Sequence, residues 1–291
     1  MAASVKLALR RLVGVVNASD SATQPLQHRV QALPLFTHRT TFVLLLVTTV
    51  ATGLVFGLYP QLDLRISALF YDPVRRAWPA DHTALFGFHR NLSILVTAIL
   101  VIFVIGARAF AAIRRRKASV ITQRVAGVLI GSLLLGPGLI VNVLLKPYWG
   151  RPRPGEVTAF GGTLDFTAWW NPHGQCDSNC SFVSGEESLA AWLFAWAVVL
   201  PARYRGPALV VAGLHSAFMA TGRLTTGAHF TSDLLFAVMV TGWSIWLMHW
   251  LLLRAPSAAA TSPGNVVAMF KGPQQPPNGG IMPRGPLSRN A

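Results

Sequence analysis

The chain has 291 residues, of which 52% are hydrophobic and only 12% are charged. That charged share is about half of what soluble domains carry, so the composition excludes a soluble globular enzyme and a disordered chain. The 25 Lys and Arg residues against 10 Asp and Glu residues give a formal charge of +15. In a chain this apolar, the excess indicates basic cytoplasmic loops of a membrane protein and not a nucleic-acid partner.

Six apolar stretches are long enough, or nearly so, to cross a hydrocarbon core, which needs about 20 helical residues. None shows the alternation of a strand, and backbone polar groups in lipid must be satisfied within their own segment. We therefore predict an all-α, polytopic bundle of six transmembrane helices, of which the fourth and fifth are short. The predicted spans are Thr41–Tyr59, Leu92–Phe110, Thr122–Leu145, Glu186–Pro201, Pro207–Thr221 and Thr231–Leu253.

The chain is thereby divided into an N-terminal segment (1–40), a membrane domain (41–253) and a C-terminal tail (254–291). Val5–Val16 carries Lys6, Arg10 and Arg11 among apolar residues and is too short to span a membrane. It is either an amphipathic helix on the membrane surface or a frayed tail, and the sequence leaves both open. The C-terminal tail is rich in Pro, Gly, Ser and Ala, so we expect it to be mobile.

The distribution of charge predicts the orientation. With the N-terminus placed in the cytoplasm, the inside segments hold 17 of the 25 basic residues but only one acid, Asp20. The run Arg114–Lys117 is the strongest single marker. Both termini are therefore predicted to be cytoplasmic.

Two outside segments are long. In the first, Leu62–Tyr71 has a helical pattern of apolar residues that could lie on the outer surface. The second contains Cys176 and Cys180, on the side where oxidation is favoured. A metal pair with His173 is the alternative, but one short disulfide explains both thiols more simply.

Charged and polar residues gather at the outer ends of the predicted spans. Lys146, Arg153 and Arg223 supply fixed positive charge and N–H donors that match a phosphate dianion. Ser184 and Gly185 open the fourth span, where a helix N-terminus offers backbone N–H groups and glycine lets an anion come close. Each residue also has an ordinary explanation, as a membrane anchor or, for Ser184, as a helix cap.

His229 and Asp233 are four residues apart and so share one helix face at the start of the sixth span. A carboxylate behind an imidazole fixes its tautomer and supports the charge that the ring gains when it attacks. Together with the cations, this pair predicts phosphoryl transfer through a phosphohistidine on the outer face of the membrane.

The spacing of these residues resembles the signature of the type 2 phosphatidic acid phosphatases, which are membrane lipid phosphatases. The signature's first part, Lys, six residues, then Arg-Pro, matches Lys146 and Arg153-Pro154. Its third part, Ser-Arg, five residues, His, three residues, Asp, is matched by Gly222-Arg223, His229 and Asp233. Its second part, Pro-Ser-Gly-His, is replaced here by Val183-Ser184-Gly185-Glu186.

The resemblance implies that His229 is the nucleophile and Asp233 its partner. It also implies phosphate binding by Lys146, Arg153, Ser184, Gly185 and Arg223, with no metal and no cofactor. Glu186 stands where the family has a histidine that protonates the leaving oxygen, and a carboxyl group can do this only when it is protonated. Glu187 is a second candidate for that acid.

The resemblance implies a lipid phosphatase of a bacterial inner membrane, with a periplasmic site and lipid A or a similar glycolipid as first choice of substrate. Undecaprenyl diphosphate, phosphatidylglycerol phosphate and phosphatidate are alternatives, and a phosphotransferase would use the same intermediate. From another class, a non-catalytic protein that binds or transports anionic lipids would explain Glu186 but not the His229–Asp233 pair. The oligomeric state stays open.

Overall fold

The computed structural model describes residues 38–114 and 121–254. The predicted surface helix at Val5–Val16 and the predicted mobile tail both lie outside these residues. The described part of the chain is helical and contains no strand, which confirms the all-α prediction. Only two isolated bridges, Asp72 with Ala77 and Val157 with Leu164, join extended segments there.

Four helical segments of the described chain are long and apolar enough to cross a membrane. The first two are α2 (His38–Leu58) and α4 (Ala84–Ile113). The third, Gln123–Tyr148, joins α5 (Gln123–Leu133), η4 (Leu134–Leu145) and α6 (Lys146–Tyr148). The fourth, Thr231–Leu253, consists of α10 (Thr231–His249) and most of η7 (Trp250–Arg254).

The helix α4 begins eight residues before the predicted second span. No proline interrupts the stretch between Ala84 and Leu92, so the helix continues outward from the apolar segment. Residues that were expected in a loop, including Phe86 and Arg90, are therefore held on a rigid helix.

The two shorter predicted spans have a different form. The fourth is divided into α7 (Gly185–Ala191) and α8 (Leu193–Val199), which meet at Trp192. The fifth lies within α9 (Ala202–Thr225), a helix of 24 residues that carries Arg203, Arg205 and Arg223. Neither is among the four candidate spans, so a count of six remains a proposal.

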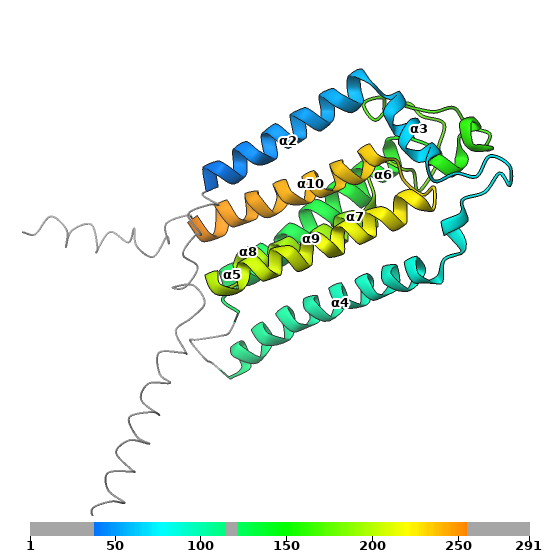
Figure 1. The fold of residues 1–291 in the computed structure, drawn as a ribbon. Coiled ribbons are helices and arrows are strands. Elements are labelled where there is room, and N and C mark those ends of the chain that lie inside the picture. Colours follow the sequence, from blue (N-terminus) through cyan, green and yellow to red (C-terminus); the bar gives the residue numbers. More distant parts are fainter. Residues whose placement is uncertain (1–37, 115–120, 255–291) are drawn as a thin grey trace, which may run out of the picture. The chain divides into compact units, whose positions relative to one another are not determined.

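The long helices α2, α4, α9 and α10 run side by side, and the short elements gather at one end of them (Figure 1). Helix α3 (Gln61–Ala68) lies within the segment where the sequence predicted a surface helix. The end of α9 and the start of α10 lie at this same end. The short elements there are α3 (Gln61–Ala68), η3 (Pro79–His82), η5 (Pro154–Glu156) and η6 (Thr158–Phe160).

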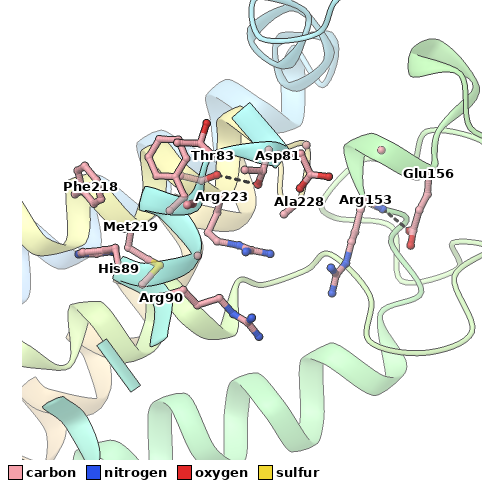
Figure 2. Close-up of a pocket in the computed structure, with 17 residues that line it drawn as sticks. Asp81, Thr83, His89, Arg90, Arg153, Glu156, Phe218, Met219, Arg223 and Ala228 are labelled. Atoms are coloured by element: carbon pink, nitrogen blue, oxygen red, sulfur yellow. Dashed lines mark hydrogen bonds between the residues drawn. The ribbon is translucent and has the colours of Figure 1, made fainter. Parts of the chain in front are cut away.

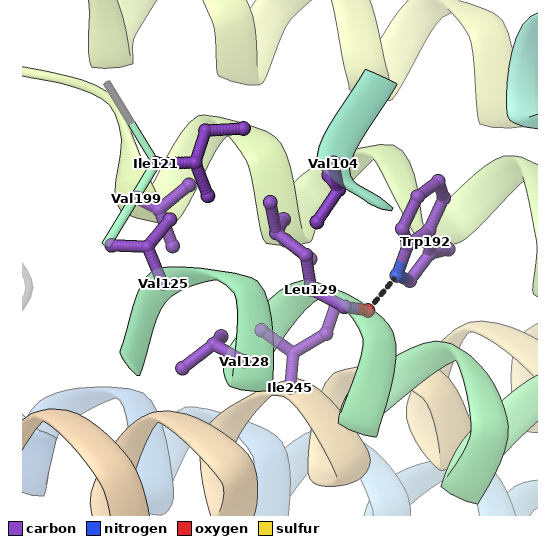
Figure 3. Packing of buried hydrophobic residues seen from close by; sticks show 9 residues of the cluster. Val104, Ile121, Val125, Val128, Leu129, Trp192, Val199 and Ile245 are labelled. Atoms are coloured by element: carbon purple, nitrogen blue, oxygen red, sulfur yellow. Dashed lines mark hydrogen bonds between the residues drawn. The ribbon is translucent and has the colours of Figure 1, made fainter. Parts of the chain in front are cut away.

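The main apolar core joins α4, α5, α8 and α10 (Figure 3). Val104 of α4, Val128 and Leu129 of α5 and Ile245 of α10 pack around Trp192, which is fully buried. The indole Nε1 of Trp192 donates a hydrogen bond to the Leu129 carbonyl at 2.9 Å. Because a buried indole needs such a partner, this bond ties the junction of α7 and α8 to α5.

Candidate active site

The turn between α9 and α10 positions His229. Gly227 has φ +67°, and a Cβ atom there would lie 2.3 Å from the Trp78 ring, so only glycine fits. The backbone N–H of His229 donates to the Arg223 carbonyl at 3.2 Å. The imidazole is thereby fixed one turn before Asp233, at the start of α10.

The His229 imidazole is fully buried and oriented by the loop that precedes α7. Its Nδ1 lies 2.8 Å from the Ser181 carbonyl oxygen. A carbonyl can only accept, so in the neutral ring Nδ1 carries the hydrogen and Nε2 has the lone pair. Among the described residues Nε2 has no hydrogen-bond partner, although it is buried. An unprotonated, unpartnered nitrogen of this kind is a suitable nucleophile.

Asp233 lies behind the imidazole but does not contact it directly. Its Oδ2 is 3.9 Å from Nδ1 of His229 and accepts a hydrogen bond from the Ser181 hydroxyl at 2.5 Å. The same oxygen accepts from the Phe230 N–H at 2.9 Å. Asp233 is therefore connected to His229 through Ser181, a residue that the sequence did not single out.

Arg151 is fully buried between two carboxylates and does not face the cations of the predicted phosphate site. Its guanidinium pairs with Asp233 and, at 2.7 Å, with Asp63 Oδ2 of α3. It also donates to the Ser232 hydroxyl at 2.8 Å and to the Thr167 carbonyl at 2.9 Å. Burial raises the pKa of Asp63, and the adjacent Arg151 guanidinium opposes that rise. Arg151 thus connects α3 to the start of α10.

Replacing Arg151 by methionine should strongly destabilise the fold, because it leaves Asp63 and Asp233 buried without a counter-charge. The expected loss is about 3–5 kcal/mol of unfolding free energy. Thermal or denaturant unfolding of the purified variant in detergent measures it. Arg75→Met is the matched control, since the Arg75 side chain is 80% exposed. Equal stability of the two variants would show that the buried charges are not coupled.

The predicted phosphate-binding residues surround the same end of the bundle. Ser184 is the N-cap of α7, and its hydroxyl accepts from the Glu187 N–H at 3.3 Å. A Cβ atom on Gly185 would lie 3.6 Å from Nζ of Lys146, so the amine lies against the start of α7. The guanidinium of Arg153 is held by the Asn179 carbonyl at 2.8 Å.

Arg223 contributes from the end of α9. Its Nε is buried and has no hydrogen-bond partner among the described residues. Desolvation lowers the pKa of this guanidinium, and the Glu186 carboxylate counteracts the shift. Since an arginine stays protonated at neutral pH, Arg223 presents a charged donor that can bind an anion.

The two glutamates at the start of α7 have different surroundings. Glu186 Oε2 lies 3.8 Å from Nε2 of His229, and its Oε1 accepts from Nε of Arg90 at 3.3 Å. Glu187 is fully buried and receives a hydrogen bond from Ser216 of α9. The structure therefore brings Glu186, and not Glu187, next to the imidazole.

A cavity of about 450 Å³ adjoins these residues. Arg90, Arg153 and Arg223 line it, and Figure 2 shows their guanidinium groups extending toward one shared space. Phe86, Phe218 and Met219 form an apolar wall of the same cavity. The cavity thus joins a cluster of arginines to an apolar wall, and Asp81 and Glu156 also line it.

Cys176 and Cys180 form a disulfide with their Cα atoms 5.8 Å apart. The bridge closes the loop immediately before Ser181, whose N–H donates to the Arg151 carbonyl at 2.8 Å. His173 is exposed, and the described residues contain no group of three potential ligands that could hold a metal ion.

Comparison with known proteins identifies the class. A model of the PAP2 superfamily matches residues 125–256, a range that contains all the predicted catalytic and phosphate-binding residues. The chain is 30% identical to a lipid A 4'-phosphatase of Francisella tularensis subsp. novicida (strain U112) over 217 residues. That alignment covers 73% of this chain and 96% of the relative. This protein therefore belongs to the PAP2 superfamily.

Two further relatives carry the same name, lipid A 4'-phosphatase. One, from Rhizobium etli, is 33% identical over 205 residues, which are 66% of this chain and 79% of the relative. The other, from Rhizobium leguminosarum, is 44% identical over 116 residues, which are 40% of this chain and 48% of the relative. No solved structure matches the chain.

Proposed function

We propose that this protein is a membrane phosphatase that removes the 4'-phosphate of lipid A through a phosphohistidine on His229. The observation that carries the proposal is the buried Nε2 of His229, which has no hydrogen-bond partner among the described residues and lies 3.8 Å from Glu186, a carboxylate that also interacts with Lys146 and Arg223. The names of the relatives support the choice of lipid. The cavity, with its cationic and apolar sides, supports a substrate that is both anionic and apolar.

In the proposed mechanism the phosphate is held by Lys146, Arg153 and Arg223 and by the N–H groups at Ser184 and Gly185. These donors are fixed before the substrate arrives, so they can stabilise the charge of the transition state without reorganising. The family residue at position 222 is serine, and here it is glycine. A Cβ atom at Gly222 would lie 2.8 Å from the Phe86 ring, which explains the glycine.

In the first step, the lone pair of His229 Nε2 forms a bond to phosphorus. The bond from phosphorus to the 4' oxygen breaks, and its electron pair leaves with the sugar oxygen. Glu186 protonates that oxygen, while Asp233 and Ser181 support the charged ring. In the second step, water attacks phosphorus and gives its proton to Glu186. The P–N bond breaks, which releases inorganic phosphate and restores the imidazole.

Glu186 contacts Arg90 through Oε1, which leaves Oε2, the oxygen 3.8 Å from His229 Nε2, to carry the acidic proton. Arg223 and Lys146 favour the ionised form of Glu186 in the free enzyme. A phosphate dianion bound by these cations offsets their charge and so favours the protonated form that a general acid needs. The rate should therefore fall as pH rises and the acid loses its proton. Glu186→Gln should be slower and should lose this alkaline decline, which a pH profile of kcat measures. An unchanged alkaline limb would remove Glu186 as the acid.

We further propose that α7–α8 and α9 also cross the membrane, so that residues 41–253 form a six-span domain with cytoplasmic termini. The predicted site residues then share the periplasmic end of a bacterial inner membrane. A cysteine at position 74 should react with an impermeant reagent in intact spheroplasts, and one at position 118 only after lysis. The reverse pattern would invert the orientation.

A panel of purified lipids tests the function directly. The protein in detergent should release phosphate from lipid A faster than from undecaprenyl diphosphate, phosphatidylglycerol phosphate or phosphatidate. Faster phosphate release from one of the other lipids would show that the protein is a phosphatase with that lipid, and not lipid A, as its substrate. Lipid binding without release from any of them would favour a non-catalytic binding protein.

A further inference from the structure

Arg90 lies outside the PAP2 match and outside every motif that the sequence analysis used, yet it reaches the centre of the site. It belongs to α4, and its Nε donates to Glu186 Oε1 at 3.3 Å. The other oxygen of that carboxylate is the one 3.8 Å from the nucleophilic nitrogen of His229. A single glutamate therefore joins Arg90 to the reacting atom.

Two departures from the family signature contact the same face of α4. Glu186, in place of histidine, accepts from Arg90. Gly222, in place of serine, leaves room for the ring of Phe86. Phe86 and Arg90 are four residues apart, so they lie on one face of the helix. Both substitutions are therefore explained by the position of α4 against α7 and α9.

A second set of contacts, next to Arg90, holds α4 against α9. His89 Nε2 lies 3.1 Å from His215 Nδ1, and the hydroxyl of Ser93 lies 3.0 Å from His215 Nε2. These bonds connect two helices that together line the cavity. The backbone of Arg90 is consequently fixed, while its side chain is 48% exposed to the cavity side.

The guanidinium of Arg90 is oriented to bind an anion. Glu186 engages Nε, and the two terminal nitrogens extend toward the space between Arg153 and Arg223 (Figure 2). The terminal edge of a guanidinium can bind two oxygens of one phosphate. Three arginines facing one space attract an anion into it.

We infer that Arg90 is a further phosphate-binding residue of this enzyme and that Glu186 is the positioning residue that orients it. The inference rests on the proposed function and extends it. It adds one cation from α4 to the phosphate-binding cations that lie within residues 125–256, the part of the chain that matches the PAP2 superfamily. The ligand class is a phosphate monoester dianion. Its phosphate is bound by Arg90 together with Arg153 and Arg223, with its apolar portion toward Phe86 and Phe218.

Kinetics with lipid A as substrate test the first part. Arg90→Ala should lower kcat/KM by about 10²-fold, as the loss of one charged donor to a transition state does. Arg90→Lys keeps the charge but loses the two-point contact, so it should recover about tenfold of that loss. Arg75→Ala, an exposed arginine of the outer segment, is the matched control and should equal the parent. An Arg90→Ala enzyme with the parent's kcat/KM would overturn the inference.

A double-mutant cycle tests the positioning role. If Glu186 works partly by holding Arg90, the two substitutions remove some of the same effect. The fold loss of kcat/KM in the combined Arg90→Ala and Glu186→Ala variant should then be smaller than the product of the fold losses in the two single variants. Losses that multiply would show that the two residues act independently and would overturn the positioning role.

Binding of orthovanadate separates this inference from the choice of substrate. Vanadate occupies a phosphate site without turnover, and its affinity for Arg90→Ala should be about 10–100-fold weaker than for the parent. If no lipid of the panel is hydrolysed but this difference persists, the proposed function fails and the role of Arg90 stands. If lipid A is hydrolysed and vanadate binds both proteins equally, the function stands and the role of Arg90 fails.

Discussion

Replacing His229 by alanine should abolish phosphate release from lipid A, with a fall in kcat of about 10⁴- to 10⁶-fold. The reason is that Nε2 is the atom that bonds to phosphorus in the proposed mechanism. Of the described histidines, His89 and His215 are engaged with each other between α4 and α9. The residual rate would come only from the cations that hold the phosphate.

His173→Ala is the matched control, because His173 lies exposed in the outer loop. It should retain the parent's rate. Lipid binding by His229→Ala should also remain, since Lys146, Arg153 and Arg223 are untouched. Equal phosphate release by His229→Ala and the parent would remove His229 from the mechanism.

Asp233→Asn should lower kcat by about 10²- to 10⁴-fold while leaving lipid binding largely intact. Asp233 accepts hydrogen bonds from Ser181 and from the Phe230 N–H, and it pairs with buried Arg151. An amide keeps the shape but loses the charge that supports the imidazolium-like ring. It also presents an NH2 group to donors, which disturbs Ser181 and thereby the tautomer of His229.

Asp63→Asn separates the catalytic part of this effect from the structural part. Asp63 shares Arg151 and Ser232 with the start of α10 but makes no contact with Ser181 or His229. It should lower thermal stability with little change in kcat at low temperature. If Asp63→Asn and Asp233→Asn lose kcat equally, Asp233 has no role beyond holding the fold.

The sequence predicted those parts of the molecule that depend on local composition or on spacing. The long apolar segments became α2, α4, Gln123–Tyr148 and Thr231–Leu253 because membrane helices satisfy their own backbone. The residues of the first and third motifs lie near one end of the helix bundle. The sequence predicted this, because each of them falls at the same end of a predicted span.

The contacts that the sequence did not reveal are all made between distant elements. Ser181 orients His229 through its backbone carbonyl, which carries no signal in the residue type. Arg90 reaches Glu186 only because α4 begins earlier than its apolar core. Asp63 did have a signal, since a carboxylate among the leucines of a short helix requires a buried partner. That partner is Arg151, which the sequence did not single out from the neighbouring cations Lys146 and Arg153.

The central claim is that lipid A's phosphate passes through Nε2 of His229. It is tested most directly by mixing the enzyme with lipid A labelled in the 4'-phosphate, stopping the reaction in alkali and locating the label by mass spectrometry. The account predicts label on the peptide that contains His229, at the imidazole, and none on the His229→Ala protein. Turnover with the label bound to a different side chain would contradict it.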